Sequence, residues 1–219
     1  MAYPKWLFPK WANRTPLPLA GLLGVVAVSA ITAFAYYISP YSTQVGYQPH
    51  QPVPYSHKLH AGDLGMDCRY CHVGVERSPV AMVPATATCM NCHKMIKPES
   101  ELLVPVRESF ETGEPVEWIR IHHSPDFVYF NHSIHVNSGV GCETCHGRID
   151  QMIEVRQAKP LSMGWCLDCH RAPEKYLRPV EEVTTMGYMP PGGDQLALGL
   201  ELRHARNLNP TTNCAGCHR

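Results

Sequence analysis

The sequence predicts a fold made mostly of loops and short α-helices, preceded by one N-terminal transmembrane helix. Three observations lead to this prediction. First, 20 prolines and 16 glycines are spread over 219 residues, which favours short elements over long helices or a continuous sheet. Second, an uncharged apolar run lies near the N-terminus, and third, all ten cysteines fall into closely spaced pairs. The equal counts of 19 basic and 19 acidic residues argue against a nucleic-acid-binding protein.

The apolar run covers residues 17–38 and contains no charged side chain. Its length is sufficient to cross the hydrocarbon core of a membrane, which takes about 20 helical residues. Lys5, Lys10 and Arg14 precede the run, and the positive-inside rule therefore predicts a cytoplasmic tail at residues 1–16. We expect a single-pass anchor in the cytoplasmic (inner) membrane, with the rest of the chain exported.

A cleaved signal peptide is the alternative, because residues 28–30 offer small side chains at a plausible cleavage position. The run is longer than the usual core of a signal peptide, which favours an uncleaved anchor. Residues 39–54 contain four prolines and no charged side chain, and they predict an extended linker. Residues 55–219 then form a periplasmic domain.

Every cysteine belongs to a Cys-x-x-Cys-His motif, and the motifs are numbered 1 to 5 along the chain. The cysteine pairs are Cys68/Cys71, Cys89/Cys92, Cys142/Cys145, Cys166/Cys169 and Cys214/Cys217, followed by His72, His93, His146, His170 and His218. This motif attaches c-type haem. The two thiols bond covalently to one edge of the porphyrin, and the histidine becomes the proximal ligand of the iron. The sequence therefore predicts five covalently bound c-type haems.

Zinc sites and disulfides explain these motifs less well. A zinc ribbon closes two Cys-x-x-Cys units around one metal, so five units leave one over and give the histidines no role. Cys-x-x-Cys spacing is also more often redox-active than structural. Roughly 36 residues are available for each haem, far fewer than a conventional domain needs for its core. The expected fold class is therefore a multihaem cytochrome, in which loops and short helices wrap around five haems.

An internal repeat supplies candidates for the distal iron ligands. Residues 55–60 (YSHKLH) precede motifs 1 and 2, and residues 130–135 (FNHSIH) precede motifs 3 and 4. The repeat predicts two dihaem modules, at residues 55–94 and 130–171, with the fifth motif at 214–218. Two histidines three residues apart project from one face of a helical turn and cannot bind opposite sides of one iron. Each is therefore expected to be the distal ligand of a different haem, and these ligands are His57, His60, His132 and His135.

The fifth iron has no such obvious distal ligand. His122 is the first candidate for this position. Met152 and Met163, near the second module, are the alternatives, because thioether ligation is common in c-type cytochromes and raises the reduction potential. His50 and His204 are interpreted as ordinary solvated histidines.

Four segments extend the pattern beyond the haem motifs themselves. They read PYSHKLHAGDLGMDCRYCH, ATCMNCHK, WIRIHHSPDFVYFNHSIHVNSGVGCETCH and PLSMGWCLDCHR. They resemble the pentahaem cytochrome c subunit of bacterial alternative complex III, and the dihaem module is similar to the wider class III multihaem cytochromes. The resemblance runs from the anchor to Arg219. Tyr55 stands where phenylalanine is common in this motif, and residues 186–206 have no counterpart that we can assign.

The resemblance implies an electron-transfer subunit without substrate chemistry of its own. Complexes of this family are quinol-oxidising respiratory or photosynthetic assemblies, in which an integral membrane subunit binds and oxidises menaquinol. Electrons reach the haems by way of an iron–sulfur subunit, and a monohaem cytochrome c subunit or another small carrier takes them onward. These three subunits are the expected partners.

Two other functions stay open at this stage. A multihaem reductase enzyme needs an iron with a free coordination position, which nitrite reductases mark by lysine in place of a motif histidine, whereas all five motifs here keep histidine. A stand-alone, membrane-anchored quinol dehydrogenase that feeds periplasmic reductases would also have one anchor and several haems. The glutamate-rich segment at residues 99–117 is interpreted as a solvated face rather than a partner site.

Overall fold

The computed structural model describes residues 9–39 and 44–218, which belong to two units, residues 1–43 and 44–219. The first unit is dominated by helix α1 (Pro16–Ile38), which begins with prolines in its first turn, where their missing N–H groups cost no hydrogen bond. α1 is long and apolar enough to cross a membrane, as a membrane anchor or a signal sequence would be. Residues 1–8, with Lys5, and linker residues 40–43 lie outside the described residues.

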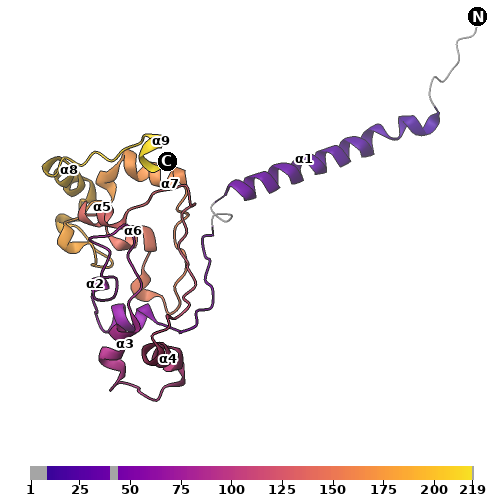
Figure 1. The fold of residues 1–219 in the computed structure, drawn as a ribbon. Helices are drawn as coiled ribbons and strands as arrows, with labels where there is room; N and C mark the ends of the chain where they lie inside the picture. The colour runs from indigo at the N-terminus through magenta and orange to yellow at the C-terminus, as the bar shows by residue number, and fades with distance from the viewer. Residues whose placement is uncertain (1–8, 40–43, 219) are drawn as a thin grey trace, which may run out of the picture. The chain divides into compact units, whose positions relative to one another are not determined.

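The second unit consists of short helices joined by loops (Figure 1). Its α-helices are α2 (Cys68–Cys71), α3 (Thr86–His93), α4 (Val104–Thr112), α5 (His132–Asn137), α6 (Cys142–His146), α7 (Met163–Arg171), α8 (Gln195–Ala205) and α9 (Cys214–Cys217). Between them lie a π-helical turn, η3 (Lys58–Asp63), and the 3₁₀ turns η4 (Glu101–Leu103), η5 (Ile149–Gln151), η6 (Pro173–Lys175), η7 (Val180–Glu182) and η8 (Pro191–Gly193). Within residues 9–39 and 44–218 the only β pairing consists of isolated bridges. The predicted fold of loops and short helices is confirmed.

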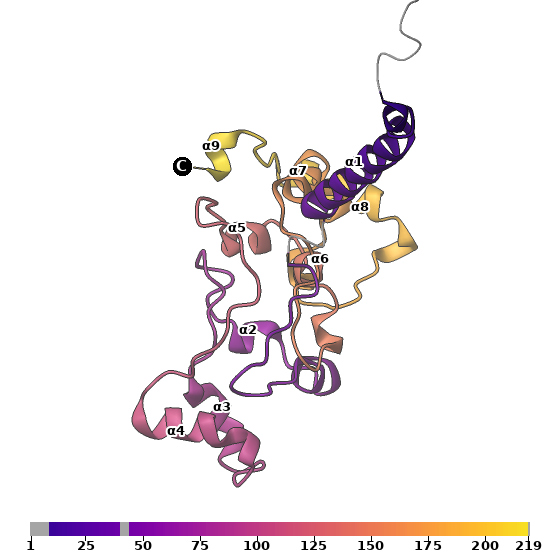
Figure 2. The ribbon, with the colours of Figure 1, turned by 90° about the vertical axis from the view of Figure 1, so that its right-hand side faces the viewer.

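The helices that carry the five motifs follow one another through the second unit. α3 and α4 lie at one end, α2 is next, α5 and α6 occupy the middle, and α7, α8 and α9 lie at the other end (Figures 1 and 2). This order in space differs from the order in the sequence, because α2 lies between α3 and α6.

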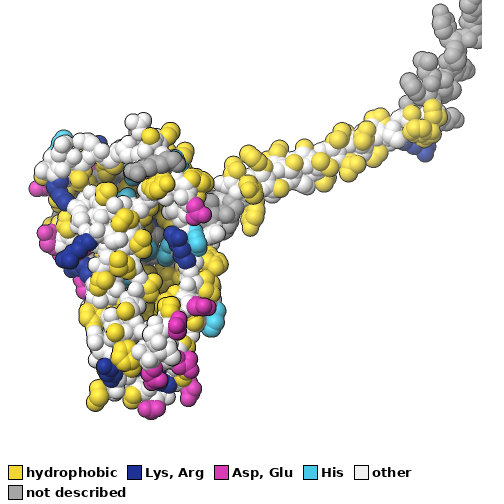
Figure 3. Space-filling model, viewed as in Figure 1, with side chains coloured by type: hydrophobic (Ala, Val, Ile, Leu, Met, Phe, Trp, Pro, Cys, Tyr) yellow, Lys and Arg dark blue, Asp and Glu magenta, His cyan; other side chains and the backbone are white. Residues whose placement is uncertain are grey.

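The apolar core of this unit is small. One cluster joins Val53, Met90 and Val106, and thereby packs the end of the linker against α3 and α4. The remaining buried apolar side chains of the described residues are Val136, Met152, Leu177 and Val183. Many other large apolar side chains are exposed, and Figure 3 shows them spread over the visible face of this unit. Such exposure is unusual for a soluble domain that is held together by its own side chains.

A buried ion pair fixes the loop that follows motif 4 onto motif 3. The Arg178 guanidinium is almost fully buried and donates hydrogen bonds to Glu143 Oε1 (2.8 Å) and to the Thr185 carbonyl oxygen (2.9 Å). Glu143 also accepts a hydrogen bond from the backbone N–H of Gly187 (2.6 Å). Gly141 leaves the space for this guanidinium, since a Cβ there would overlap it. Glu143 lies between the cysteines of motif 3, so the ion pair sets the position of that motif.

Helix α8 lies within residues 186–206, for which the sequence resemblance gave no counterpart. Asp194 caps its first turn by accepting a hydrogen bond from the Ala197 N–H (2.9 Å). The helix packs on η6, where Arg203 forms an ion pair with Glu174 (2.8 Å). Gly199 is buried at this contact, and a Cβ there would overlap the Glu174 carbonyl oxygen.

The replacement Gly199→Ala should therefore destabilise the protein by roughly 1–3 kcal/mol, because α8 would have to move away from η6. Chemical unfolding of the haem-loaded protein measures this loss. Glu201→Ala, on the exposed face of the same helix, is the matched control and should stay within about 0.5 kcal/mol of the wild type. If both variants were equally stable, the proposed packing of α8 on η6 would be wrong.

Candidate haem-binding sites

Each motif forms, or ends, a short helix. Motifs 1, 3 and 5 begin α2, α6 and α9 with their first cysteine, whereas motifs 2 and 4 occupy the last turns of α3 and α7. Side chains three residues apart on a helix lie on the same face, so both thiols of a motif can reach one edge of a single porphyrin. Caps define where two of these turns begin: Asp67 accepts a hydrogen bond from Arg69 N, and Ser162 accepts one from Trp165 N.

The structure brings three predicted distal histidines opposite a motif histidine. The ring centroids are 6.2 Å apart for His60 and His93, 6.2 Å for His135 and His170, and 6.5 Å for His132 and His146. A histidine nitrogen binds a metal at about 2 Å. Two imidazoles on opposite sides of one iron therefore have ring centres about 6 Å apart, which is the separation of these three pairs. The residues present fit an iron with two axial histidines.

The two copies of the aromatic-x-His-x-x-His repeat have nearly the same geometry. Tyr55 stacks on His60 with ring centroids 4.4 Å apart, and Phe130 stacks on His135 at 4.6 Å. Each aromatic ring also makes an edge contact with the first histidine of its pair, at 4.8 Å and 4.7 Å. The aromatic position of the repeat therefore holds both imidazoles, and tyrosine serves in the first copy as phenylalanine does in the second.

A second shared feature of these histidines is the hydrogen bonding of their Nδ1 atoms. In seven of the ten predicted ligand histidines, Nδ1 lies within hydrogen-bond distance of a backbone carbonyl oxygen. The pairs are His60 with Ser56 (2.9 Å), His72 with Met82 (2.7 Å), His93 with Ile96 (2.9 Å), His132 with Pro79 (3.0 Å), His135 with Asn131 (2.8 Å), His170 with Thr211 (2.6 Å) and His218 with Phe127 (3.4 Å). A carbonyl oxygen can only accept, so Nδ1 carries the proton and Nε2 keeps a free lone pair for iron.

His57 and His146 are kept neutral by other means. Burial, followed by the positive charges that His72, His60 and His122 could carry, lowers the pKa of His57 to about 4. Burial, and then the neighbouring imidazoles beginning with His122, lowers the pKa of His146 to about 3. Both rings are therefore uncharged at neutral pH, as a metal ligand must be. The Nδ1 atom of His57 is buried and has no hydrogen-bond partner in the described part of the chain.

His122 lies beside motif 3. Its ring centroid is 4.4 Å from that of His146, with the ring planes at 80°, and its Nε2 atom is 3.3 Å from Nδ1 of His146. The structure thus places His122 on the edge of His146 that faces away from a ligand position at Nε2. Its assignment as the distal ligand of the fifth haem stays a prediction.

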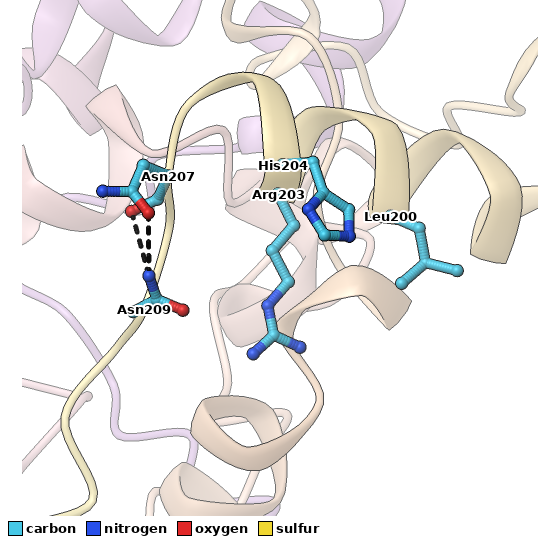
Figure 4. Close-up of a pocket in the computed structure, with 5 residues that line it drawn as sticks. All are labelled: Leu200, Arg203, His204, Asn207 and Asn209. Atoms are coloured by element: carbon cyan, nitrogen blue, oxygen red, sulfur yellow. Dashed lines mark hydrogen bonds between the residues drawn. The ribbon is translucent and has the colours of Figure 1, made fainter.

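The structure also describes the two methionine candidates for the fifth iron and three further histidines. Met152 is buried behind motif 3, and Met163 is exposed at the start of α7. His218 contacts the ring of Phe127 at 5.6 Å. His50 is exposed. His204 lines a shallow surface pocket together with Leu200, Arg203, Asn207 and Asn209 (Figure 4), and none of these belongs to a motif.

Six of the ten cysteines have a raised thiol pKa, whereas a hydrogen bond with Cys142 lowers the pKa of Cys68. Burial raises the pKa of the Cys145 thiol to about 12 and that of Cys169 to about 11. Burial likewise raises the pKa of Cys71, Cys89 and Cys166. A nucleophilic cysteine needs the opposite shift. In residues 9–39 and 44–218 no cluster of three or more His, Cys, Asp or Glu side chains converges on one point, as a tetrahedral zinc site would require.

Exposed apolar side chains surround the motifs. They include Tyr70, Val73, Val80, Met82, Val83, Met95, Ile96, Phe127, Tyr129 and Ile134. These residues lie within motif 1, in the loops that follow motifs 1 and 2, and around α5. Porphyrin faces are large and apolar, and such side chains are the surface that they would cover.

The comparisons with known proteins agree with this site. Residues 128–219 match the family model for cytochrome c7 and related cytochrome c. A relative from Nitratidesulfovibrio vulgaris, the multiheme cytochrome c subunit of menaquinone reductase, is 38% identical over 100 residues. The match covers 45% of this chain and 47% of the relative, so it spans about half the length of that protein. The chain therefore carries a multihaem c-type cytochrome domain, and that part of the sequence prediction is confirmed. The number of five haems and the individual ligands stay predictions.

The pairing of His60 with His93 can be tested by the replacement His60→Ala. Cys89 and Cys92 should still hold the haem, but its iron would lose one axial ligand. The variant should keep the haem content of the wild type, show one high-spin ferric haem in electron paramagnetic resonance, and bind carbon monoxide when reduced. His204→Ala, which changes a histidine outside the pairs, should leave all three properties unchanged. An unaltered low-spin spectrum in His60→Ala would contradict the pairing.

Proposed function

We propose that this chain is a membrane-anchored pentahaem c-type cytochrome that passes electrons within a quinol-oxidising complex of the alternative complex III type. One observation carries the proposal: three pairs of imidazoles are held 6.2–6.5 Å apart. Two strong axial ligands leave no coordination position for a substrate, and such iron sites transfer electrons rather than catalyse bond chemistry. Together with the histidine that all five motifs keep, these pairs favour an electron conductor over a nitrite or hydroxylamine reductase.

The electron balance of the proposal is simple. Oxidation of one menaquinol to menaquinone releases two electrons and two protons. The electrons pass through the chain one at a time, and an oxidised periplasmic carrier takes up one electron each time it is reduced. When bound, haem supplies the reversible one-electron chemistry of iron. The histidines described above would hold the haem iron, and the carbonyl oxygens hydrogen-bonded to their Nδ1 atoms keep Nε2 unprotonated.

The proposed partners follow from the same role. An integral membrane subunit would bind the quinol, an iron–sulfur subunit would deliver the electrons, and a monohaem cytochrome c subunit would receive them. α1 would anchor the chain in the cytoplasmic membrane, with the N-terminus in the cytoplasm and the haem domain in the periplasm. The uncharged run of α1 and the basic residues before it support this orientation.

The relative is a subunit of a menaquinone reductase, which favours a second candidate function in which electrons flow in the opposite direction. In that case a reduced periplasmic carrier would supply electrons one at a time, and menaquinone would take up two electrons and two protons to become menaquinol. The same ligand pairs suit electron flow in either direction, because electron transfer between haems is reversible. The direction depends on the partner subunits.

Intact mass spectrometry tests the cofactor and anchor parts of the proposal together. The purified protein should carry the mass of five haems and retain its first 38 residues. Replacing both cysteines of any one motif by alanine should remove one haem. Fewer than five haems in the wild type would contradict the pentahaem assignment, whereas loss of residues 1–30 would show a cleaved signal peptide instead of an anchor.

Electron flow is tested on the complex isolated in detergent. Menaquinol should reduce the haems, as followed by visible absorption, and the partner subunits should copurify. The second candidate would be favoured by a different result. In that case a reduced periplasmic carrier would reduce the haems completely, the haems would pass electrons to menaquinone, and menaquinol would not reduce the haems. Isolation of the chain without any quinol-binding subunit would favour a stand-alone quinol dehydrogenase.

A further inference from the structure

We propose that the five attachment motifs form one linear row in the order 2–1–3–4–5, with motifs 2 and 5 at its ends. The inference deepens the proposed electron-transfer function and rests on it. The order differs from that of the sequence, because the two modules face each other through their first motifs.

Motif 2 adjoins motif 1. The Asn91 side-chain amide donates a hydrogen bond to the Tyr70 hydroxyl (3.1 Å), and each of these residues lies between the two cysteines of its own motif. The turn that begins at His57 also serves both motifs, since His60 faces His93 of motif 2 and Met66, just before motif 1, donates its N–H to the His60 carbonyl (3.0 Å). On its other side, α3 packs against α4, so motif 2 lies at an end of the row.

Motif 1 adjoins motif 3 through reciprocal contacts between the modules. The backbone N–H of Ser133 donates to the Ser78 carbonyl (3.3 Å), and that of Lys58 donates to the Met152 carbonyl (2.9 Å). In both cases the donor residue directly follows the first histidine of its repeat. The acceptor residue lies six positions after the histidine of the first motif in the other module. Such exchange, in which i contacts j and j contacts i, is the pattern of two like units meeting face to face.

Further contacts at this junction join the same two motifs. His132 donates from its backbone N–H and from Nδ1 to the Pro79 carbonyl oxygen (3.2 Å and 3.0 Å), in the loop that follows motif 1. Val183 and Thr184 bridge the motifs: the Val183 carbonyl accepts from Cys142 N (2.9 Å), and the Thr184 hydroxyl donates to Asp67 (3.0 Å), the cap of α2. Motif 1 therefore lies between motifs 2 and 3.

Motifs 3 and 4 share helix α5. His132 faces His146 of motif 3, and His135, one turn further along the same helix, faces His170 of motif 4. A single six-residue helix thus holds one ligand of each neighbouring pair.

Motif 5 follows motif 4. Nδ1 of His170 donates to the Thr211 carbonyl (2.6 Å), three residues before Cys214. The Tyr129 N–H donates to the Cys217 carbonyl (2.9 Å), which fixes α9 against the segment leading into α5. Figures 1 and 2 show the same order, from α3 through α2 and α6 to α7 and α9. A redox partner that uses the whole row must therefore approach α3 or α9.

A matched pair of variants, His57→Met and His60→Met, tests the order. Methionine ligation raises the potential of the haem that receives it. Such a haem is reduced first, and its changed charge lowers the potentials of its direct neighbours, with an effect that falls with distance. Potentiometric titration of the haem-loaded protein, followed by electron paramagnetic resonance, counts the other haems whose potentials shift.

His132, the first histidine of its module, faces the first motif of that module, so the equivalent His57 is assigned to motif 1. In the proposed order, His57→Met therefore changes a haem with two neighbours and should shift two other haems. His60→Met changes the terminal motif 2 and should shift one. A row in sequence order predicts the reverse, one and two, and either this reversal or equal numbers would overturn the proposal. The wild-type haem count is measured separately, so a protein with fewer than five haems would contradict the proposed function without bearing on the order.

If either variant fails to retain all its haems, the iron positions in an experimental structure of the haem-loaded wild type decide the question. The two irons nearest to that of motif 1 should belong to motifs 2 and 3. A motif 2 iron that lies between those of motifs 1 and 3 would overturn the proposal.

Discussion

A hydrogen bond from an imidazole Nδ1 to a backbone carbonyl recurs at seven of the ten predicted ligand histidines, and the loops of the second unit are shaped to supply it. The acceptors come from Ser56, Pro79, Met82, Ile96, Phe127, Asn131 and Thr211. Except for Ser56 and Asn131, each lies in irregular backbone, where a carbonyl is not already used inside a helix. A regular helix or sheet would consume these carbonyls in its own hydrogen bonds. The irregular backbone is therefore a requirement of the ligand geometry and not merely a consequence of many prolines.

The same constraint explains why the apolar core is so small. A chain that turns many carbonyls toward imidazoles cannot also bring many side chains into one cluster, and Val53, Met90 and Val106 form the only extended one among the described residues. Many large apolar side chains of this unit are instead exposed, and bound porphyrins would cover those around the motifs. Burial of that surface, together with two axial bonds to each iron, would then contribute most of the folding free energy, as metal binding does in other small metalloproteins.

The sequence was sufficient for the features that depend on spacing. The Cys-x-x-Cys-His motifs, the repeated aromatic-x-His-x-x-His turn and the apolar helix are local patterns, and the structure gives the two repeats matching ring geometry around Tyr55 and Phe130. Features that depend on distant contacts were not predictable. Nothing in the sequence marks Pro79 or Thr211 as partners of His132 or His170, because any residue supplies a carbonyl.

Two other features illustrate the same limit. The position of His122 beside His146 follows from how the segment between the modules folds back, which no local pattern records. Arg178 and Glu143 are 35 residues apart, and their burial as a pair could not be told from two ordinary surface charges. The one sequence feature connected with this pair is Gly141, because a side chain at that position would overlap the Arg178 guanidinium.

The reciprocal contacts between the modules have a consequence for how this chain could have arisen. Lys58 and Ser133 are equivalent positions, as are Met152 and Ser78, and equivalent residues exchange the same bond in both directions only around a two-fold axis. Two separate copies of a dihaem module would make this contact as a symmetric dimer. Duplication and fusion of the gene would carry the interface into a single polypeptide unchanged, with the former subunit boundary now at its centre. On this view, motif 5 and α8 are later additions, because they lie on one side of the axis and have no counterpart on the other.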